Sequence, residues 1–133
     1  MADITMSKVI FYKPQMDMML KQPQGEVGRY LHVRGRAIQA AARAQVGVRT
    51  GALRASIMIS QERAIGGQKM KVGSSLPYAL MHHEGTRPRV INARPGGMLR
   101  FTRGARVVYT RQVMHPGTRP NKFLSDNLYL ALV

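Results

Sequence analysis

Two long stretches of the chain carry many cations and no carboxylate, and this limits what the chain can form by itself. Residues 27–61 hold six arginines, and residues 85–125 hold nine Arg and Lys residues, without any Asp or Glu. The 133-residue chain has 21 Lys and Arg against 6 Asp and Glu, a formal net charge of +15. Acidic neighbours cannot neutralise these stretches locally. The excess therefore predicts an acidic partner, of which nucleic acid is the commonest.

The rest of the composition indicates one small domain without covalent cross-links. With 44% hydrophobic residues the chain has material for one modest core. It has no cysteine, which excludes disulfides, thiolate metal sites and thiol nucleophiles, so the core or neighbouring subunits must hold the fold. No apolar run approaches the roughly 20 residues that cross a bilayer, and residues 1–5 lack a secretion signal. We expect no membrane contact and a chain that is cytoplasmic when made.

Residues 1–25 have the pattern of an extended N-terminal arm. They combine a short β-like run at 9–12 with Pro14, Pro23 and a cluster of methionines, whose flexible side chains suit irregular contacts. We expect the arm to reach a neighbouring subunit, and deletion of residues 1–25 to leave a folded subunit. The side chains expected at that contact are Phe11, Tyr12, Met16 and Met19.

Residues 27–45 have the pattern of an amphipathic helix. The apolar side chains on one side are Val27, Leu31, Ile38 and Ala41 or Ala42. Arg29, Arg36 and Arg43 are spaced by seven residues, nearly two turns, and so align along one edge. This edge is either a solvated helix face or a contact with DNA or a protein partner.

The middle of the chain predicts a hairpin followed by a short helix. Apolar residues alternate with polar ones through 53–73, around a turn at Gly66 and Gly67, as in a β-hairpin with one buried face. Ser75 can cap a short helix that ends at Gly85. A basic loop is expected to follow over residues 87–106.

The last third predicts a second hairpin and a terminal helix. Residues 98–101 and 106–113 resemble two strands joined around Gly104. A helix is expected from Pro120, with an apolar stripe at Leu124, Leu128 and Ala131 or Leu132. Together these elements favour an α+β fold. It consists of an N-terminal arm (1–25) and one domain (26–133), in which a small antiparallel sheet of two hairpins packs with an N-terminal and a C-terminal helix.

No constellation for catalysis is visible. General acid-base chemistry and metal-assisted hydrolysis need clustered carboxylates or histidines, and the six carboxylates are scattered. His82, His83 and Glu84, with His115, are the one local cluster. Adjacent histidines point to different sides of a helix, so ordinary hydrogen bonds are favoured over a shared metal ion. We expect no enzyme activity, no cofactor and no metal.

A four-residue repeat is the most specific feature of the sequence. Gly-Thr-Arg-Pro occurs at residues 85–88 and again at 117–120, each time shortly after a histidine. Each copy supplies the Gly, hydroxyl and Pro of a tight turn. The copies are either two turns of similar geometry or a contact surface. The second reading places Thr86, Arg87, Thr118 and Arg119 against another subunit, and Arg87, Arg89 and Arg94 against DNA or a partner.

These motifs carry a resemblance to a known family. Residues 50–57, Tyr78-Ala79 before residues 83–86, and residues 117–120 before Phe123-Leu124 follow one another as in the head-to-tail joining and tail-completion proteins of long-tailed bacteriophages. The resemblance covers about residues 27–133. The chain departs from the family in its Met-rich arm and in its basic loop at 87–106.

The resemblance implies a structural role in the virion. Such a protein is a compact α+β subunit of a homo-oligomeric ring, often sixfold, in the neck or at the top of the tail, assembled in the host cytoplasm. Its neighbours would be connector, adaptor or stopper proteins on the head side and a tail terminator or tail tube protein on the tail side, with genomic DNA in the bore.

Two alternatives stay open. The ring could be a tail terminator or a head-tail stopper. From another class, the chain could bind duplex DNA without sequence preference; only 6% of residues are aromatic and none is Trp, so stacking platforms for single strands are scarce.

Overall fold

The computed structural model describes residues 10 and 12–132, whose helices and strands form two compact units. The first unit runs to Ser74 and resumes at Leu124, and the second is Ser75–Phe123. All sheets are antiparallel and two-stranded, so the predicted α+β class is confirmed. The sequence predicted one domain over residues 26–133, whereas a second unit is inserted between the hairpin and the last helix of the first.

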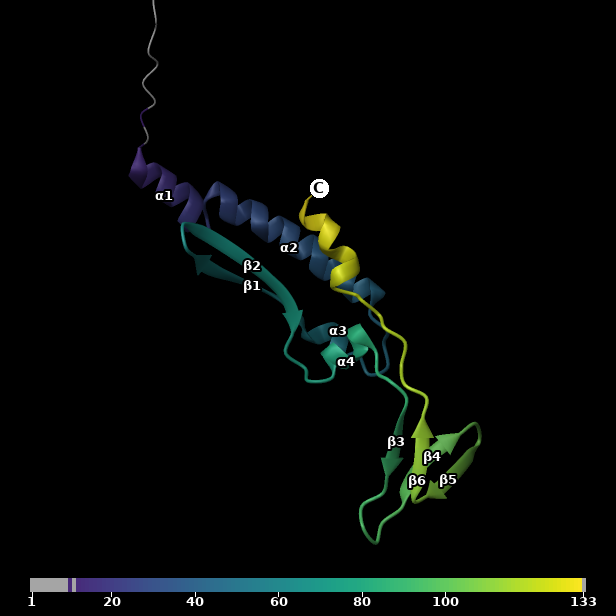
Figure 1. Cartoon of the computed structure of the whole chain (residues 1–133). Coiled ribbons are helices and arrows are strands. Elements are labelled where there is room, and N and C mark those ends of the chain that lie inside the picture. The colour runs from purple at the N-terminus through teal and green to yellow at the C-terminus, as the bar shows by residue number, and fades with distance from the viewer. Residues whose placement is uncertain (1–9, 11, 133) are drawn as a thin grey trace, which may run out of the picture. The chain divides into compact units, whose positions relative to one another are not determined.

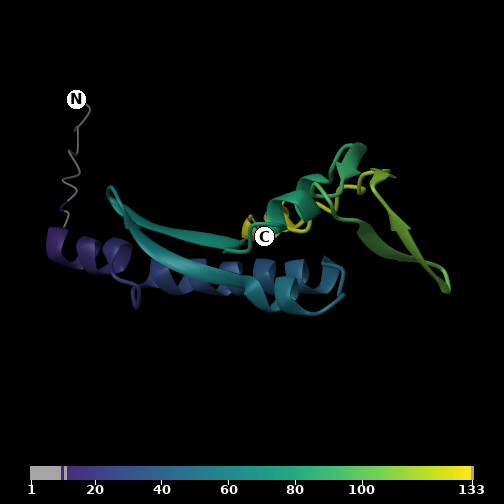
Figure 2. The ribbon, with the colours of Figure 1, turned by 90° about the horizontal axis from the view of Figure 1, so that it is seen from below.

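Three α-helices, one hairpin and a terminal 3₁₀-helix make up the described part of the first unit. Helix α2 (Glu26–Gln45) confirms the helix expected over 27–45 and buries Ile38 and Ala42. Strands β1 (Ile57–Ala64) and β2 (Gly67–Ser74) form a curved hairpin that runs along α2, as Figures 1 and 2 show from two sides. A Cβ at Gly35 would lie 2.8 Å from Met70 Cγ of β2, so any larger residue here would require the Met70 side chain to move.

The described part of the N-terminal segment is not an extended arm. Residues Lys13–Lys21 form helix α1, which has Pro14 in its first turn, where a missing N–H costs nothing. Helix α1 packs on α2 and β2, so it belongs to the first unit (Figure 1). Pro14 therefore lies at the start of a helix, and Pro23 follows its end. Phe11 lies outside the described residues.

The predicted hairpin starts too early. Residues Ala52–Ser56 form a helical turn, α3, and the strand begins at Ile57. Leu53 is buried but Ala55 is exposed, so the alternation of apolar residues there was not a strand pattern. The Ser56 hydroxyl donates to the Leu53 carbonyl at 2.7 Å, which closes the turn. Alanine and leucine favour a helix where no strand partner competes.

The terminal helix is a 3₁₀-helix, η1 (Ser125–Ala131), which packs on α2. A 3₁₀-helix repeats every three residues, so its inner face carries Leu124, Asn127 and Leu130. Asn127 is buried and donates to Gln45 Oε1 at 2.8 Å. The predicted stripe of Leu124, Leu128 and Ala131 or Leu132 assumed an α-helical period and was wrong, because Leu128 and Leu132 are exposed.

The second unit contains one short helix and two β-ribbons. Helix α4 (Ala79–Glu84) ends at Gly85, as predicted. Strand β4 (Leu99–Arg103) pairs with β5 (Arg106–Thr110) around Gly104, which confirms the second hairpin. The expected strand at 106–113 breaks at Arg111, and β6 (Gln112–His115) pairs instead with β3 (Arg89–Asn92). The predicted basic loop therefore contains two strands, β3 and β4.

Candidate functional site

The two copies of the Gly-Thr-Arg-Pro repeat bind each other. We call residues 85–88 and 117–120 the Thr clasp. Thr86 and Thr118 form an antiparallel bridge, in which the Thr86 N–H donates to the Thr118 carbonyl at 3.1 Å and the Thr118 N–H to the Thr86 carbonyl at 3.0 Å. Their hydroxyl oxygens lie 3.0 Å apart. The repeat therefore closes the base of the β3–β6 ribbon.

Glycine is required on both sides of the Thr clasp. Gly85 and Gly117 have φ angles of 76° and 83°, in the left-handed region. A Cβ on Gly85 would lie 2.6 Å from the Thr118 carbonyl oxygen, and one on Gly117 would lie 2.2 Å from that of Thr86. The symmetry of these contacts explains why Gly and Thr occur together in both copies.

The histidines near the clasp make structural contacts. His82 and His83 pack on the Phe123 ring, which is fully buried, with ring centroids 5.9 and 5.4 Å away. His83 Nδ1 lies 2.6 Å from Glu84 Oε1, and His115 Nδ1 accepts the Gly117 N–H at 3.0 Å. Among residues 10 and 12–132, no three His, Cys, Asp or Glu side chains gather where they could hold a metal ion.

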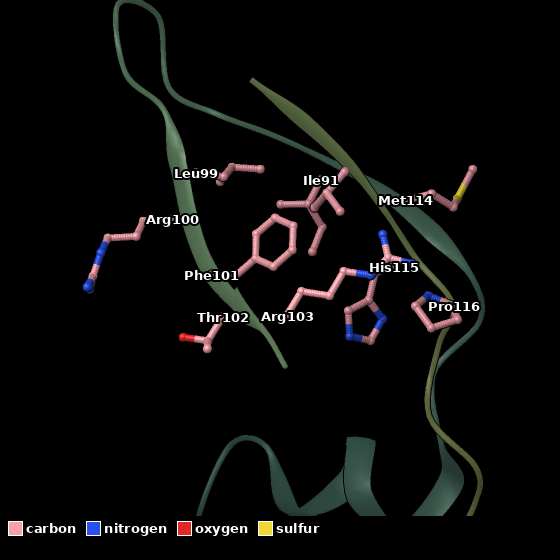
Figure 3. A pocket seen from close by; sticks show the side chains of 10 residues that line it. Ile91, Leu99, Arg100, Phe101, Thr102, Arg103, Met114, His115 and Pro116 are labelled. Atoms are coloured by element: carbon pink, nitrogen blue, oxygen red, sulfur yellow. The ribbon is translucent and has the colours of Figure 1, made fainter. Parts of the chain in front are cut away.

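An apolar hollow of about 620 Å³ opens between the two ribbons of the second unit. Figure 3 shows Ile91 from β3 and Leu99 and Phe101 from β4 turned toward one another across it. Arg103 and His115 lie at one end. Arg100 also forms part of the wall, but its side chain points away from those of Leu99 and Phe101, toward the other face of β4. None of the apolar side chains in its wall is fully buried.

The cations of the second unit have no partner among the residues that the structure describes. This unit has one carboxylate, Glu84, and nine Arg and Lys side chains. None of the nine forms a salt bridge or a side-chain hydrogen bond with another described residue. They are all exposed: Arg87, Arg89, Arg94, Arg100, Arg103, Arg106, Arg111, Arg119 and Lys122.

The carboxylates in the described part of the chain are already engaged. Asp17 pairs with Lys21, Glu26 with Arg29, and Glu62 with Lys69 and Lys71. Asp126 accepts from Gln45 at 2.8 Å, and Glu84 contacts His83. Apart from Glu84, all of these lie in the first unit. Among the described residues, the salt bridges made by Lys and Arg therefore all lie in the first unit.

The predicted arginine edge of α2 is not a continuous cationic surface. Arg29 pairs with Glu26, and Arg36 is exposed. Arg43 Nη2 donates to the Ile57 carbonyl at 2.8 Å, so Arg43 holds the start of β1. Seven residues of an α-helix fall about 20° short of two full turns, so each arginine is displaced by that angle around the helix from the one before it. From Arg29 to Arg43 the displacement is applied twice, and it brings Arg43 to the side of the hairpin.

The other predicted contact residues are distributed over both units. Tyr12 flanks α1 and Met19 lies on it, both exposed, and Met16 is half-buried. Thr86 and Thr118 bind each other, so their hydroxyls are occupied within the chain. The candidate arginines of the second unit, exposed and unpaired, are Arg87, Arg89, Arg94 and Arg119.

The hollow was missed by sequence reasoning. Leu99 and Phe101 alternate with Arg100, the period of a strand with one apolar face, and a strand was predicted at 98–101, but nothing in the sequence showed which strand its apolar face would meet. Ile91 lies in a run with one further apolar residue, Val90, too short to assign alone. The signal was present at β4 and hidden at β3.

Comparisons of the chain with protein-family models, with curated proteins and with solved structures find no match. Of the helices that the structure describes, none combines the length and the apolar character needed to cross a bilayer.

Proposed function

We propose that this chain is a structural protein of a tailed bacteriophage virion, a subunit of a homo-oligomeric ring in the neck between head and tail. The tail terminator and the head-tail stopper are the two more specific versions of this role. The family resemblance of residues 27–133 suggests the role. The observation that carries it is the set of nine exposed cations in the second unit that have no partner elsewhere in the described part of the chain.

Charge supports assembly with other molecules. A surface with eight more positive than negative side chains in 49 residues is self-repelling until anions neutralise it. Phosphates of DNA in a channel, or acidic surfaces of neighbouring virion proteins, supply such anions. Exposed apolar side chains on α1 and both ribbons add surface for protein contacts: Tyr12, Met18, Met19, Val90, Val107, Tyr109 and Met114.

The proposed role needs no catalytic residue. The Thr clasp occupies its own hydroxyls, and the histidines are engaged with Phe123, Glu84 and the Gly117 N–H. The contact arginines are the unpaired ones of the second unit, together with Arg36. Arg43 is excluded from this set because its guanidinium holds β1.

Two measurements test the ring. Native mass spectrometry of the purified chain should show a closed oligomer, and a density map of intact particles should place its copies between head and tail. Deletion of residues 1–25 is not a clean test because it removes the packed helix α1. A chain absent from particles, and monomeric both alone and with particle extracts, would contradict the role.

Duplex DNA binding is the second candidate, favoured by the same nine cations. Its test is the affinity for a 20-base-pair duplex as a function of salt. If phosphates are contacted, log K falls with log salt at a slope of about −0.9 per phosphate. Salt-independent or absent binding by the chain eliminates this candidate.

A further inference from the structure

We infer that the second unit binds an extended acidic segment of another protein, which pairs along the free edge of β4 and inserts alternate apolar side chains into the hollow. The partner is argued from the apolar wall, the strand edge and the unpaired charge. The inference rests on the proposed role only in assuming that the chain works beside other proteins.

The side chains that line the hollow favour an apolar ligand. Ile91, Leu99 and Phe101 face the hollow and stay partly exposed, although burial of apolar side chains of this size is favourable. Its volume of about 620 Å³ has room for several aliphatic side chains. The sugar-phosphate surface of a DNA duplex offers no apolar group of this kind, which makes a polypeptide the better fit.

The strands call for an extended occupant. Strand β4 pairs with β5 on one edge and with no described strand on the other. Two-stranded ribbons are marginal by themselves, and peptides bind to free edges as an added strand. Side chains of neighbouring strands share faces at every second residue. A strand added at this edge would place alternate side chains beside Leu99 and Phe101, and the others beside Arg100.

The charges call for an acidic occupant. The side chain of Arg100 points away from those of Leu99 and Phe101 and has no partner among the described residues. A second copy of this chain is a poor source of carboxylates, because those described are already paired, mainly in the first unit. An acidic segment of a different protein would cover the apolar side chains on one face of β4 and pair with Arg100 on the other.

The test uses the full chain and a seven-residue peptide in which valine alternates with glutamate, capped at both ends. Binding is measured by fluorescence anisotropy at low salt and at 0.5 M NaCl. We expect binding that weakens with salt but persists, because apolar contacts are not screened. A matched peptide with serine in place of valine should bind at least tenfold more weakly.

Two variants locate the site. Arg100→Gln should weaken peptide binding about tenfold, the effect of losing one charge-assisted hydrogen bond. Arg54→Gln, the same change at an exposed arginine of α3, should leave the Kd within about twofold. Leu99→Ser should weaken binding similarly to Arg100→Gln. Its control is Val107→Ser on the opposite face of the β4–β5 ribbon.

The outcomes separate this inference from the proposed function. Equal binding of the valine and serine peptides, no binding of either, or Arg100-dependent binding of a 20-base-pair duplex in place of the peptide overturns the inference. A ring in the neck without peptide binding leaves the proposed function standing. Specific peptide binding by a chain absent from particles leaves the inference standing alone.

Discussion

The hairpin β1–β2 and the ribbons of the second unit use the same antiparallel ladder but depend on their surroundings differently. Helix α2 covers one side of β1–β2, and Glu62 pairs with Lys69 and Lys71 across its strands. No described helix packs to a comparable extent on β3–β6 or β4–β5, and their cations are unpaired. The hairpin β1–β2 is covered and charge-paired within its own unit, whereas the two ribbons leave apolar and charged groups for another molecule.

The difference also shows in where the buried side chains lie. Seven hydrophobic residues are buried in the part of the chain that the structure describes: five lie in the first unit, and Ala79 and Phe123 lie in the second. Neither of these two lies on a ribbon. The ribbons are therefore held by backbone ladders and the Thr clasp more than by a core, which makes them responsive to a partner that supplies one.

The largest effect is expected from truncating the buried anchor of the first unit. Ile57→Ala should lower the free energy of unfolding by about 2–5 kcal/mol, because Ile57 is 0% exposed and a cavity would remain. Ile65→Ala, the same change at the exposed hairpin turn, should alter it by less than about 0.5 kcal/mol. Chemical denaturation followed by circular dichroism measures both. Equal effects would show that β1 is not anchored as described.

The clasp offers the next largest effect, confined to the second unit. Gly117→Ala should cost about 2–4 kcal/mol, because the new methyl would meet the Thr86 carbonyl at 2.2 Å in addition to left-handed strain. Gly104→Ala also has a positive φ, 63°, but open space around it, and should cost only about 1–2 kcal/mol. Hydrogen exchange should show faster opening of β3–β6 in Gly117→Ala. Equal protection in the two variants would contradict the clasp.

The sequence predicted local elements better than their partners. Periodicity placed α2 and the turns at Gly66 and Gly104 correctly, because helix propensity and turn chemistry act over a few residues. It failed where tertiary context decides. The residues around β6 carry no local signal that it pairs with β3 and not with β5. This pairing is fixed by the bridge between Thr86 and Thr118.

The candidate site was predictable in part for a similar reason. The repeat signalled that residues 85–88 and 117–120 matter, but not that they bind each other. The spacing of Arg29, Arg36 and Arg43 suggested three equal cations, since it carries no information on the carbonyl of Ile57 that Arg43 meets. Arginine roles were therefore set by neighbours distant in sequence.

Two arginines of α2 allow a smaller test of the same contrast. Arg43→Met should lower the free energy of unfolding by about 0.5–1.5 kcal/mol, since it removes the hydrogen bond to Ile57. The loss is moderate because Gln39 Nε2 donates to the same carbonyl at 2.8 Å and keeps it satisfied. Arg36→Met, at an exposed position, should stay within about 0.5 kcal/mol in denaturation experiments. If Arg36→Met destabilised the chain more than Arg43→Met, Arg43 would again count among the contact residues.

The smallest effect concerns the paired charges of β1–β2. Hydrogen bonds from Lys71 and then Lys69 lower the pKa of Glu62 below its ordinary value. Because the folded pKa is depressed, the stabilisation is present above the unfolded pKa and is lost as pH falls through the folded pKa. The wild type should therefore lose slightly more stability than Glu62→Gln on acidification below about pH 4.5, as followed by denaturant midpoints.

Salt separates this pair from the cations of the second unit. The difference between wild type and Glu62→Gln should shrink at 0.5 M NaCl, since Glu62 is partly exposed, both lysines are exposed, and salt screens the pair. Salt should act on Arg100→Gln in the opposite direction. That variant removes an unpaired charge and relieves repulsion, so its stability relative to wild type should be highest at low salt. If both variants respond to salt alike, the contrast between paired and unpaired charge in the two units does not hold.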